Sequence, residues 1–493
     1  MKKESVLKGL EPQKVFDYFE RITQIPHGSG NEKVLSDYIV SQAQDMGYEV
    51  KQDAAYNVIV EIPASPGYEG GKKTIVQAHI DMVCSKTEDS LHDFEKDPLD
   101  ICIDGAFIRA RNTTLGADDG SGVAIMLAMM ADEELKHPPL QLLFTTGEEI
   151  MFVGAKAMDE YFLDGEQLIG LDCSSAQTIV VSCAGISVGC IQLPLTKEPL
   201  ENKRGEAFFR ISIQGLLGGH SGNMIHTGRV NGIKLLGELL SALGEKMNYK
   251  LLSVESPGLI NIINKAAAAE ICCEAEVAEE VENLIQELFT EVKNVYKVKE
   301  PGLLLMAERR NGTCLDHAYD AETKKNLLQM LEVLPYGVRT MMPDRDMAES
   351  SMNCGYLLER NNVLELGVSV RSNSEYQHDG LLRELRYIAE AADGGFLLDS
   401  RSAAWEYDPG SPLQKRAKAV YERINGEPPE LKTLHASVEA SVFVEKMKKR
   451  NRSIDIINIG CDQYDVHTPR ERLKISSVDK TYKFLKAILE ASE

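Results

Sequence analysis

Apolar residues recur along this chain with two different spacings. A spacing of three to four residues, typical of an amphipathic helix, runs through residues 12–25 and again from Glu32 to a helix end at Gly47. Further on, helical stretches such as residues 120–135 and 154–162 alternate with short continuous apolar runs, which cover residues 56–62, 74–79, 140–146 and 168–172. Such runs are typical of strands buried on both faces of a sheet. The pattern predicts an α/β fold with a mostly parallel central sheet.

A different pattern fills the middle of the chain. From about Glu206, alternating strands are mixed with amphipathic helices, and from about Trp405 the first pattern returns. We therefore predict that one α/β domain, made of residues 1–205 and 399–493, is interrupted by an inserted α+β domain over residues 206–398.

Composition narrows the classes of partner. The 493 residues carry a formal net charge of -22, and nucleic acid or anionic lipid would need clustered Lys and Arg instead. The longest apolar run, residues 123–131, is far shorter than the ~20 residues that span a bilayer. No signal-peptide pattern follows Met1, and the ten cysteines show no paired spacing. We expect a cytoplasmic protein without nucleic-acid or membrane partners.

Three of the predicted strands end in acids or histidine. His79 and Asp81 follow one strand, Glu148 and Glu149 follow the next, and Asp172 follows a third. The carboxyl ends of parallel strands meet at one edge of a sheet, where ligands collect. A single Asp at a strand end is usually a cap or turn residue. Three such segments together predict a shared polar site.

His79 and Asp81 have the spacing of a metal-binding histidine and its orienting acid. One imidazole nitrogen can bind a metal while the carboxylate accepts the other ring N–H, which fixes the tautomer. By itself, this pair is more often a buried histidine bonded to a carboxylate without a metal.

Two pairs of adjacent acids offer further ligands. Asp118 and Asp119 enter an apolar helix, where a carboxylate can cap the helix or bridge two metals. Glu148 and Glu149 repel each other unless they share a cation or one takes up a proton. A metal ligand beside a general base would satisfy both glutamates, and so would a solvated surface loop.

Two histidines in polar loops complete the set of candidates. Glycines flank His220 in the stretch 218–222, which lets the backbone approach another group closely. His467 lies in the polar loop 461–469, after a predicted strand. Each histidine is weak evidence alone, but the order and setting of all these segments are informative.

In this order the segments resemble the dinuclear zinc peptidases and amidohydrolases, a family that includes glutamate carboxypeptidase, tripeptidase T and succinyl-diaminopimelate desuccinylase. The resemblance covers nearly the whole chain from Ile25 onward. The turn 115–120, the stretch 215–228 and the overall length are most similar to the aminoacyl-histidine dipeptidases, also called Xaa-His or carnosinase-type dipeptidases. The resemblance implies a zinc-peptidase-like catalytic domain, an inserted lid domain and a homodimer.

The resemblance also implies two zinc sites that share one ligand. His79 and Asp172 would bind one ion, Glu149 and His467 would bind the other, and Asp118 would bridge them. Ligands made of imidazole nitrogen and carboxylate oxygen suit zinc but also manganese or cobalt.

Five further roles follow from the resemblance. Asp81 would orient the metal-binding histidine at the end of its strand, and Glu148 would be the general base. In the lid domain, His220 would approach the scissile carbonyl. Arg371 and Asn261 would hold the carboxylate or carbonyl of the substrate.

The expected reaction is hydrolysis of a small dipeptide, first of all Xaa-His such as β-alanyl-histidine, by a water held between two zinc ions. The same centre could instead deacylate N-acyl amino acids or serve a broader di- or tripeptidase. A non-catalytic binding protein would lack a ligand or the base, and neither is missing. Residues 173–175 and 435–441 depart from the histidine dipeptidase pattern, so the substrate is less closely matched than the metal site.

Overall fold

Two compact units make up the chain, in a computed structural model that describes residues 5–200, 203–342 and 347–491. The first unit runs to Cys183 and continues over Tyr407–Leu434 and from Val438 onward, and the second contains Ala184–Glu406 and His435–Ser437. The expected boundaries at 205/206 and 398/399 fall inside the second unit. The reason is that strand β9 (Gly185–Pro194) pairs there with β20 (Val363–Ser372) and β21 (Gly395–Arg401).

An eight-stranded sheet forms the centre of the first unit, in the order β1-β2-β6-β3-β7-β23-β8-β22. Its strands are β1 (Glu49–Gln52), β2 (Val58–Ile62), β3 (Thr74–His79), β6 (Leu140–Thr145), β7 (Gln167–Gly170), β8 (Thr178–Cys183), β22 (Glu430–Leu434) and β23 (Asp455–Asn458). The neighbours β6, β3, β7 and β23 run parallel. Every residue of β3, β6 and β7 is buried, which explains their continuous apolar sequences. The predicted fold class is confirmed.

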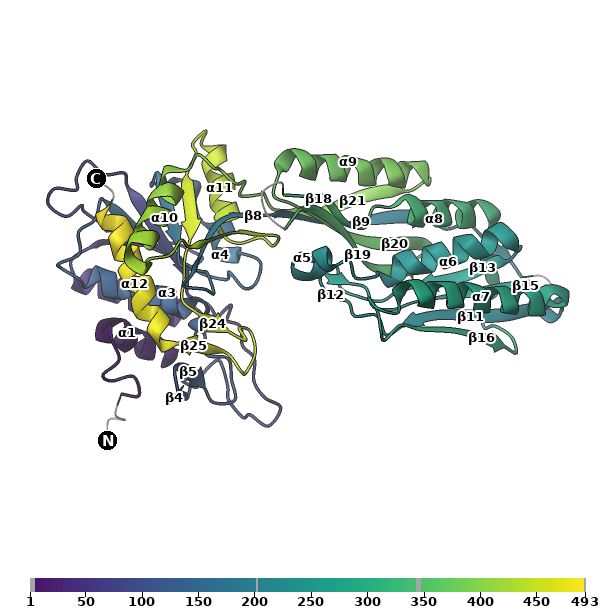
Figure 1. Ribbon diagram of the computed structural model, residues 1–493, viewed down its shortest axis with the longest axis horizontal. Coiled ribbons are helices and arrows are strands. Elements are labelled where there is room, and N and C mark those ends of the chain that lie inside the picture. The colour runs from purple at the N-terminus through teal and green to yellow at the C-terminus, as the bar shows by residue number, and fades with distance from the viewer. Residues whose placement is uncertain (1–4, 201–202, 343–346, 492–493) are drawn as a thin grey trace. The chain divides into compact units, whose positions relative to one another are not determined.

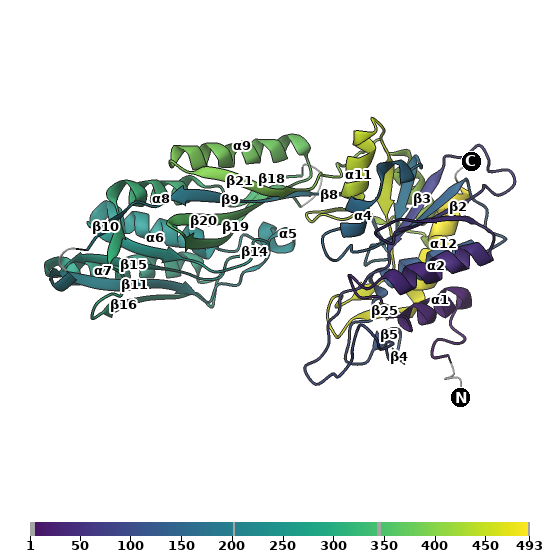
Figure 2. The ribbon, with the colours of Figure 1, turned by 180° about the vertical axis from the view of Figure 1, so that it is seen from behind.

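Helices pack on this sheet and on one another. The helix α3 (Ala117–Met130) contacts β3 and is buried on nearly all sides, so its sequence is apolar all round. Figure 2 shows α1 (Gln13–Thr23) and α2 (Lys33–Asp45), which both contact α3. The helices α10 (Pro412–Asn425) and α12 (Ile475–Glu490) meet at Tyr421 and Phe484, whose ring centroids are 5.1 Å apart.

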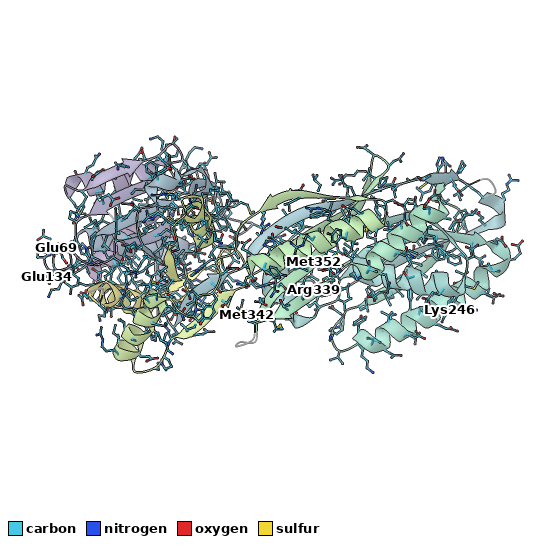
Figure 3. All side chains as sticks on the ribbon, turned by 90° about the horizontal axis from the view of Figure 1, so that it is seen from above. Glu69, Glu134, Lys246, Arg339, Met342 and Met352 are labelled. Atoms are coloured by element: carbon cyan, nitrogen blue, oxygen red, sulfur yellow. The ribbon has the colours of Figure 1, made fainter. Side chains whose placement is uncertain are left out.

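The loops before β3 and β6 lie at the amino edge of the parallel strands. The Ser65 N–H donates to the His137 carbonyl across 3.0 Å. Figure 3 labels Glu69 and Glu134, from the same two loops, at one end of the first unit. All strand-end candidates therefore belong to the opposite, carboxyl edge.

A small sheet of order β24-β25-β5-β4 holds the loop that contains His467. Its strands are β4 (Ile101–Asp104), β5 (Phe107–Ala110), β24 (Gln463–Tyr464) and β25 (Arg472–Lys474). Because β24 pairs with β25, the two ends of the intervening loop are fixed next to each other.

Two large antiparallel sheets and four long helices build most of the second unit (Figure 1). One sheet has the order β13-β15-β11-β16 and the other β18-β19-β20-β9-β21. The strands not yet bounded are β11 (Glu206–Gln214), β13 (Lys250–Glu255), β15 (Ala267–Glu274), β16 (Leu304–Arg310), β18 (Gly337–Met341) and β19 (Ala348–Arg360). The helices are α6 (Gly232–Lys246), α7 (Ala278–Tyr296), α8 (Ala321–Val333) and α9 (Glu375–Ala391). They bury a hydrophobic core that belongs to this unit.

The helix expected over residues 154–162 is shorter in the structure. The helix α4 (Val153–Ala157) ends before Met158, whose backbone is extended, and a single 3-10 turn follows at Glu160–Phe162. The Asp159 side chain accepts the Tyr161 N–H across 2.8 Å, a local bond that competes with helix continuation. Within the described residues, no helix is long and apolar enough to cross a membrane.

Candidate active site

The three neighbouring strands β6, β3 and β7 end at the same level of the sheet. The register places His79, the last residue of β3, opposite Thr145 at the end of β6. Gln77 of β3 is opposite Gly170 at the end of β7. The segments that follow these strand ends carry Asp81, Glu148, Glu149 and Asp172. The sheet therefore brings together residues that are up to 93 positions apart in the sequence, the separation of His79 and Asp172.

His79 lies between two carboxylates. Its Nδ1 is 3.1 Å from the Asp81 carbonyl oxygen and 3.5 Å from Asp81 Oδ1. Its Nε2 is 3.4 Å from Asp118 Oδ1. Burial lowers the pKa of His79, but Asp118 and Asp81 raise it well above its ordinary value. With Nδ1–H directed at Asp81, the neutral ring presents its Nε2 lone pair on the side of Asp118.

Asp81 also fixes the loop after β6. Its two carboxylate oxygens accept the backbone N–H groups of Glu148 and Glu149, across 3.0 and 3.3 Å. The Ser29 hydroxyl donates to the same carboxylate across 2.8 Å. Asp81 is 1% exposed, so these bonds are shielded from water. One side chain thus orients both the histidine of β3 and the two glutamates beyond β6.

Asp118 lies between two groups of potential ligands. In the first group, ligand atoms of His79, Asp118 and Asp172 all lie within 4.8 Å of one another, and in the second the same holds for Asp118, Glu149 and His467. His467 Nε2 is 3.4 Å from Asp118 Oδ2 and 2.8 Å from Glu149 Oε1. Asp118 is the member that both groups share, and it turns one oxygen to each histidine.

His467 is held in a strained loop. Its backbone φ is 64° and that of Asp465 is 52°, in the left-handed region that residues with a side chain rarely adopt. Such strain persists where the surrounding structure fixes the chain, and it concentrates at functional sites. The contacts with Asp118 and Glu149 raise the pKa of His467 to about 10.

The acids at this edge are crowded and buried. Burial and the neighbouring Asp118 raise the pKa of Asp172 to about 7. Burial also raises the pKa of Glu148 well above its ordinary value, with further contributions from Asp172, Glu439 and Glu149. So many carboxylates can remain ionised together only if positive charge is supplied between them.

These donors fit a pair of divalent cations. Two imidazoles and three carboxylates, arranged in two groups with a shared aspartate, are the ligand types that zinc takes in dinuclear sites. A third group of His79, Glu148 and Glu149 adds one further carboxylate beside the first histidine. The residues present can therefore hold two metal ions and leave one glutamate for proton transfer.

Glu471 is a contributor that the sequence analysis missed. This glutamate is 2% exposed and accepts four backbone N–H groups, from Leu115, Gly116, Ala117 and Asp118, across 2.7 to 3.4 Å. It therefore fixes the turn that carries Asp118. Its position four residues after His467 was the only signal in the sequence.

Glu439 is a second missed residue. It is 2% exposed, and its Oε2 accepts from Gln77 Nε2 across 2.8 Å and from Thr145 Oγ1 across 2.7 Å. Its Oε1 is buried and has no partner among the described residues. Burial raises the pKa of Glu439 to about 8. Glu439 thus ties α11 (Ala440–Lys449) to β3 and β6 and adds another acid to the crowded edge.

The remaining candidates belong to the second unit. His220 is half-buried, and its Nδ1 accepts the Gly222 N–H across 3.2 Å. This bond fixes the tautomer, because the proton of the neutral ring is then on Nε2. Burial, together with the positive charge of Arg371, lowers the pKa of His220, which favours that neutral form. His220 is thus prepared to donate through Nε2.

Arg371 and Asn261 differ in their surroundings. Arg371 is 4% exposed, burial lowers its pKa to about 10, and its Nε has no partner in the described part of the chain. Asn261 has an exposed side chain, and its carbonyl accepts the Ser221 N–H across 2.8 Å. His220 also pairs with Ile262, so the structure places Asn261 next to the His220 segment.

His435, which lies in a stretch that departs from the histidine dipeptidase pattern, belongs to the second unit. Its Nε2 is 2.7 Å from Ser351 Oγ, and its Nδ1 is 3.5 Å from Asn373 Oδ1. Burial and the charge of Arg371 lower the pKa of His435 to about 3. The segment Cys461–Pro469, by contrast, remains with the first unit.

Comparison with known proteins gives matches over the whole chain. The cytosol non-specific dipeptidase of Escherichia coli (strain K12) is 32% identical over 487 residues, which are 99% of each protein. The crystal structure of an aminoacylhistidine dipeptidase from Vibrio alginolyticus superposes with a TM-score of 0.92 at 30% identity and covers 99% of both chains. The aminopeptidase PepT of Bacillus cereus has the same fold, with a TM-score of 0.55 at 15% identity, 98% of this chain and 99% of that one.

The family model for peptidase family M20/M25/M40 matches residues 75–491. This range contains each of the candidate residues, from His79 to His467. The resemblance seen in the sequence is confirmed. The chain belongs to peptidase family M20/M25/M40 and is an enzyme that acts on peptide bonds.

Proposed function

We propose that this protein is a dipeptidase that hydrolyses small dipeptides with the help of two divalent cations. The observation that carries the proposal is the pair of ligand groups that share Asp118 at the carboxyl edge of the sheet. Full-length similarity to two dipeptidases supports the choice of substrate class.

The two groups suggest how the ligands are divided. His79 and Asp172 would hold one cation, Glu149 and His467 would hold the other, and both would share Asp118. Zinc is the first choice, and manganese or cobalt would accept the same donors. When bound, the cations polarise the substrate carbonyl and lower the pKa of water.

Glu148 is the general base in this proposal. Its backbone N–H is bound by Asp81, so its carboxylate is held beside His79 and Glu149. It accepts a proton from the attacking water and later returns it to the departing amine. Asp81 does not touch the substrate, because it acts by orienting His79 and the glutamate loop.

The second unit supplies substrate contacts and acts as a lid. We assign to His220 the donation of its Nε2–H to the oxygen of the scissile carbonyl, where negative charge develops. Arg371 binds the carboxylate of the dipeptide, and Asn261 assists with the carboxylate or carbonyl. Closure of such a lid excludes water and admits only short peptides.

Xaa-His dipeptides are the proposed main substrates. The aminoacylhistidine dipeptidase that matches in structure supports this choice. The name of the E. coli relative supports a second candidate, a dipeptidase of broad specificity. Deacylation of N-acyl amino acids is the remaining alternative.

A substrate panel separates these functions. Purified protein with Zn²⁺, Mn²⁺ or Co²⁺ is given β-alanyl-histidine, glycyl-histidine, a dipeptide without histidine and N-acetyl-histidine, and released amino acids are measured. We expect histidine to be released fastest from the two Xaa-His dipeptides. Equal rates on all three dipeptides would favour broad specificity, and cleavage of N-acetyl-histidine alone would contradict the proposal.

A homodimer in the cytoplasm completes the proposal, on the basis of the family resemblance. Sedimentation velocity of the purified protein tests the assembly. A single monomeric species at all concentrations would contradict it.

A further inference from the structure

One buried carboxylate binds the backbone on both sides of His220. Glu300 is 1% exposed. Its Oε2 accepts the Leu217 N–H across 2.7 Å, and its Oε1 accepts the Val230 N–H across 2.9 Å. These two donors lie on either side of His220, so Glu300 ties the two ends of the segment 215–230 together.

Glu300 is itself fixed by the backbone around it. It follows α7, where its N–H donates to the Tyr296 carbonyl across 2.8 Å, and its own carbonyl accepts the Leu303 N–H across 3.0 Å. The turn also touches the start of the His220 segment. A Cβ on Gly215, whose φ is 74°, would lie 2.0 Å from the Gly302 carbonyl oxygen, so only glycine permits this approach.

Other contacts hold the inside of the segment. The Arg229 guanidinium donates to the Gly218 carbonyl, and the Tyr336 hydroxyl donates to the Arg229 carbonyl across 2.7 Å. His220 pairs with Ile262 in the short ladder of β12 (Gly219–His220) and β14 (Ile262–Ile263). The position of the His220 backbone therefore depends on Glu300 at both ends and on Arg229 and β14 between them.

A carboxylate is the one side chain of this size that suits the place of Glu300. Both oxygens must accept, and each receives a backbone N–H. A glutamine would keep one acceptor and turn its NH₂ group against the other N–H, which would leave two donors facing each other in a buried site. Hydrogen bonds to both oxygens stabilise a carboxylate that is buried there.

We propose that Glu300 is a positioning residue for peptide hydrolysis, which acts through the segment 215–230 by placing His220. The inference rests on the role proposed for His220 above. Glu471 uses the same device on the turn that carries Asp118, where one buried carboxylate also accepts several backbone N–H groups.

A double-mutant cycle tests the coupling between Glu300 and His220. Glu300→Gln should lower kcat on the Xaa-His dipeptide by about 10-fold to 100-fold, with KM and bound metal nearly unchanged, because a displaced donor weakens contacts made in the transition state. In a His220→Ala background, the same change should cost less than about twofold. If Glu300→Gln lowered kcat by the same factor in the wild type and in the His220→Ala background, the inference would be overturned.

Glu270→Gln is the matched control. Glu270 lies in β15 of the same unit, where Arg210 and Arg310 donate to it across 3.4 and 3.2 Å. Its loss should lower the unfolding temperature of the protein but leave kcat within about twofold, because it does not touch the His220 segment. A kcat loss equal to that of Glu300→Gln would show a general structural effect and overturn the inference.

Hydrogen–deuterium exchange on the unmodified protein tests whether Glu300 holds both ends of the segment 215–230, even if Glu300→Gln does not fold. The amides of Leu217 and Val230 should exchange as slowly as those of β11, and rapid exchange of both would overturn the inference. This measurement does not depend on turnover. An inactive wild-type protein with both amides protected would therefore contradict the proposed dipeptidase function. It would still support the role of Glu300 in holding the segment 215–230.

Discussion

The acids at the carboxyl edge of the sheet have different surroundings although they are chemically similar. Glu148 and Glu149 are adjacent in the chain, but only Glu149 contacts His467, across 2.8 Å. Their backbone N–H groups are both held by Asp81, which prevents the two side chains from exchanging places. The proposed metal ligand, Glu149, and the proposed general base, Glu148, are therefore neighbours in the chain with different contacts.

Glu148→Gln tests this separation. The amide cannot take a proton from water, so we expect turnover of a dipeptide to fall by at least about 100-fold. Bound metal, measured by elemental analysis, should stay at the wild-type level because the five proposed ligands are intact.

Glu149→Gln is the natural comparison for that variant. It removes a charged ligand beside His467, so we expect weaker metal binding as well as lower turnover. Normal turnover of Glu148→Gln at full metal occupancy would exclude the assigned base.

His435 makes the second unit sensitive to acid. Its pKa is about 3 in the folded protein, against an ordinary value of 6.5, because it is buried and close to Arg371, with His226 as a further positive neighbour. The unfolded chain therefore binds more protons below pH 6.5. The free energy of unfolding falls as the pH drops towards 3, by about 2 kcal/mol between pH 7 and pH 5 from this group.

Thermal unfolding at pH 7 and pH 5 measures this effect. The wild-type unfolding temperature should fall over this interval, and that of His435→Gln should fall less, whatever its value at pH 7. An equal fall in both proteins would mean that His435 is not responsible.

At the scale of elements, strands decide where the site lies. The sequence predicted β3, β6 and β7 because all three are buried on both faces and leave continuous apolar runs. The helix expected over residues 154–162 ends early, at Ala157, because a single side chain, Asp159, offers the backbone a local alternative. The spacing of apolar residues indicates which segments are buried, but it does not reveal a single side-chain hydrogen bond that ends a helix.

Close approach of two strand ends gives a prediction at this scale. A Cβ on Gly460, just beyond β23, would lie 1.8 Å from the Cys173 carbonyl oxygen, next to Asp172. Gly460→Ala should therefore push the two segments apart, lower the stability by about 1–3 kcal/mol and weaken metal binding. Unfolding temperature and metal content measure both effects.

Gly70→Ala controls for the substitution itself, because no atom lies within 4 Å of a Cβ at that position. It should keep the metal content and unfolding temperature of the wild type. Full metal content in Gly460→Ala would show that the strand ends tolerate separation.

At the scale of the whole molecule, the proposed metals stabilise one unit only. All five proposed ligands belong to the first unit. Removal of metal by a chelator leaves Asp118, Asp172 and Glu149 without compensating charge, so this unit should lose stability. For one bound ion, a metal concentration of about 100 times Kd adds about 2.7 kcal/mol to the free energy of unfolding, and this contribution is lost when the metal is removed.

Hydrogen–deuterium exchange with and without the chelator locates that loss. Exchange should accelerate in β3, β6 and β7, stay unchanged in β11 and β15, and return to its original rate with Zn²⁺. Faster exchange in both units alike would contradict a site confined to the first.

The sequence by itself determined the fold class, the family and the strand ends that carry the candidate site, because buried strands leave apolar runs and the motifs follow in a fixed order. Only the tertiary structure decided that Asp118 faces both histidines, that Asp81 binds the glutamate loop, and that Glu471 and Glu300 fix the turns around Asp118 and His220. The physical reason is that these contacts join residues far apart in the chain. A buried glutamate that accepts distant backbone N–H groups has the same local sequence pattern as a glutamate on the surface.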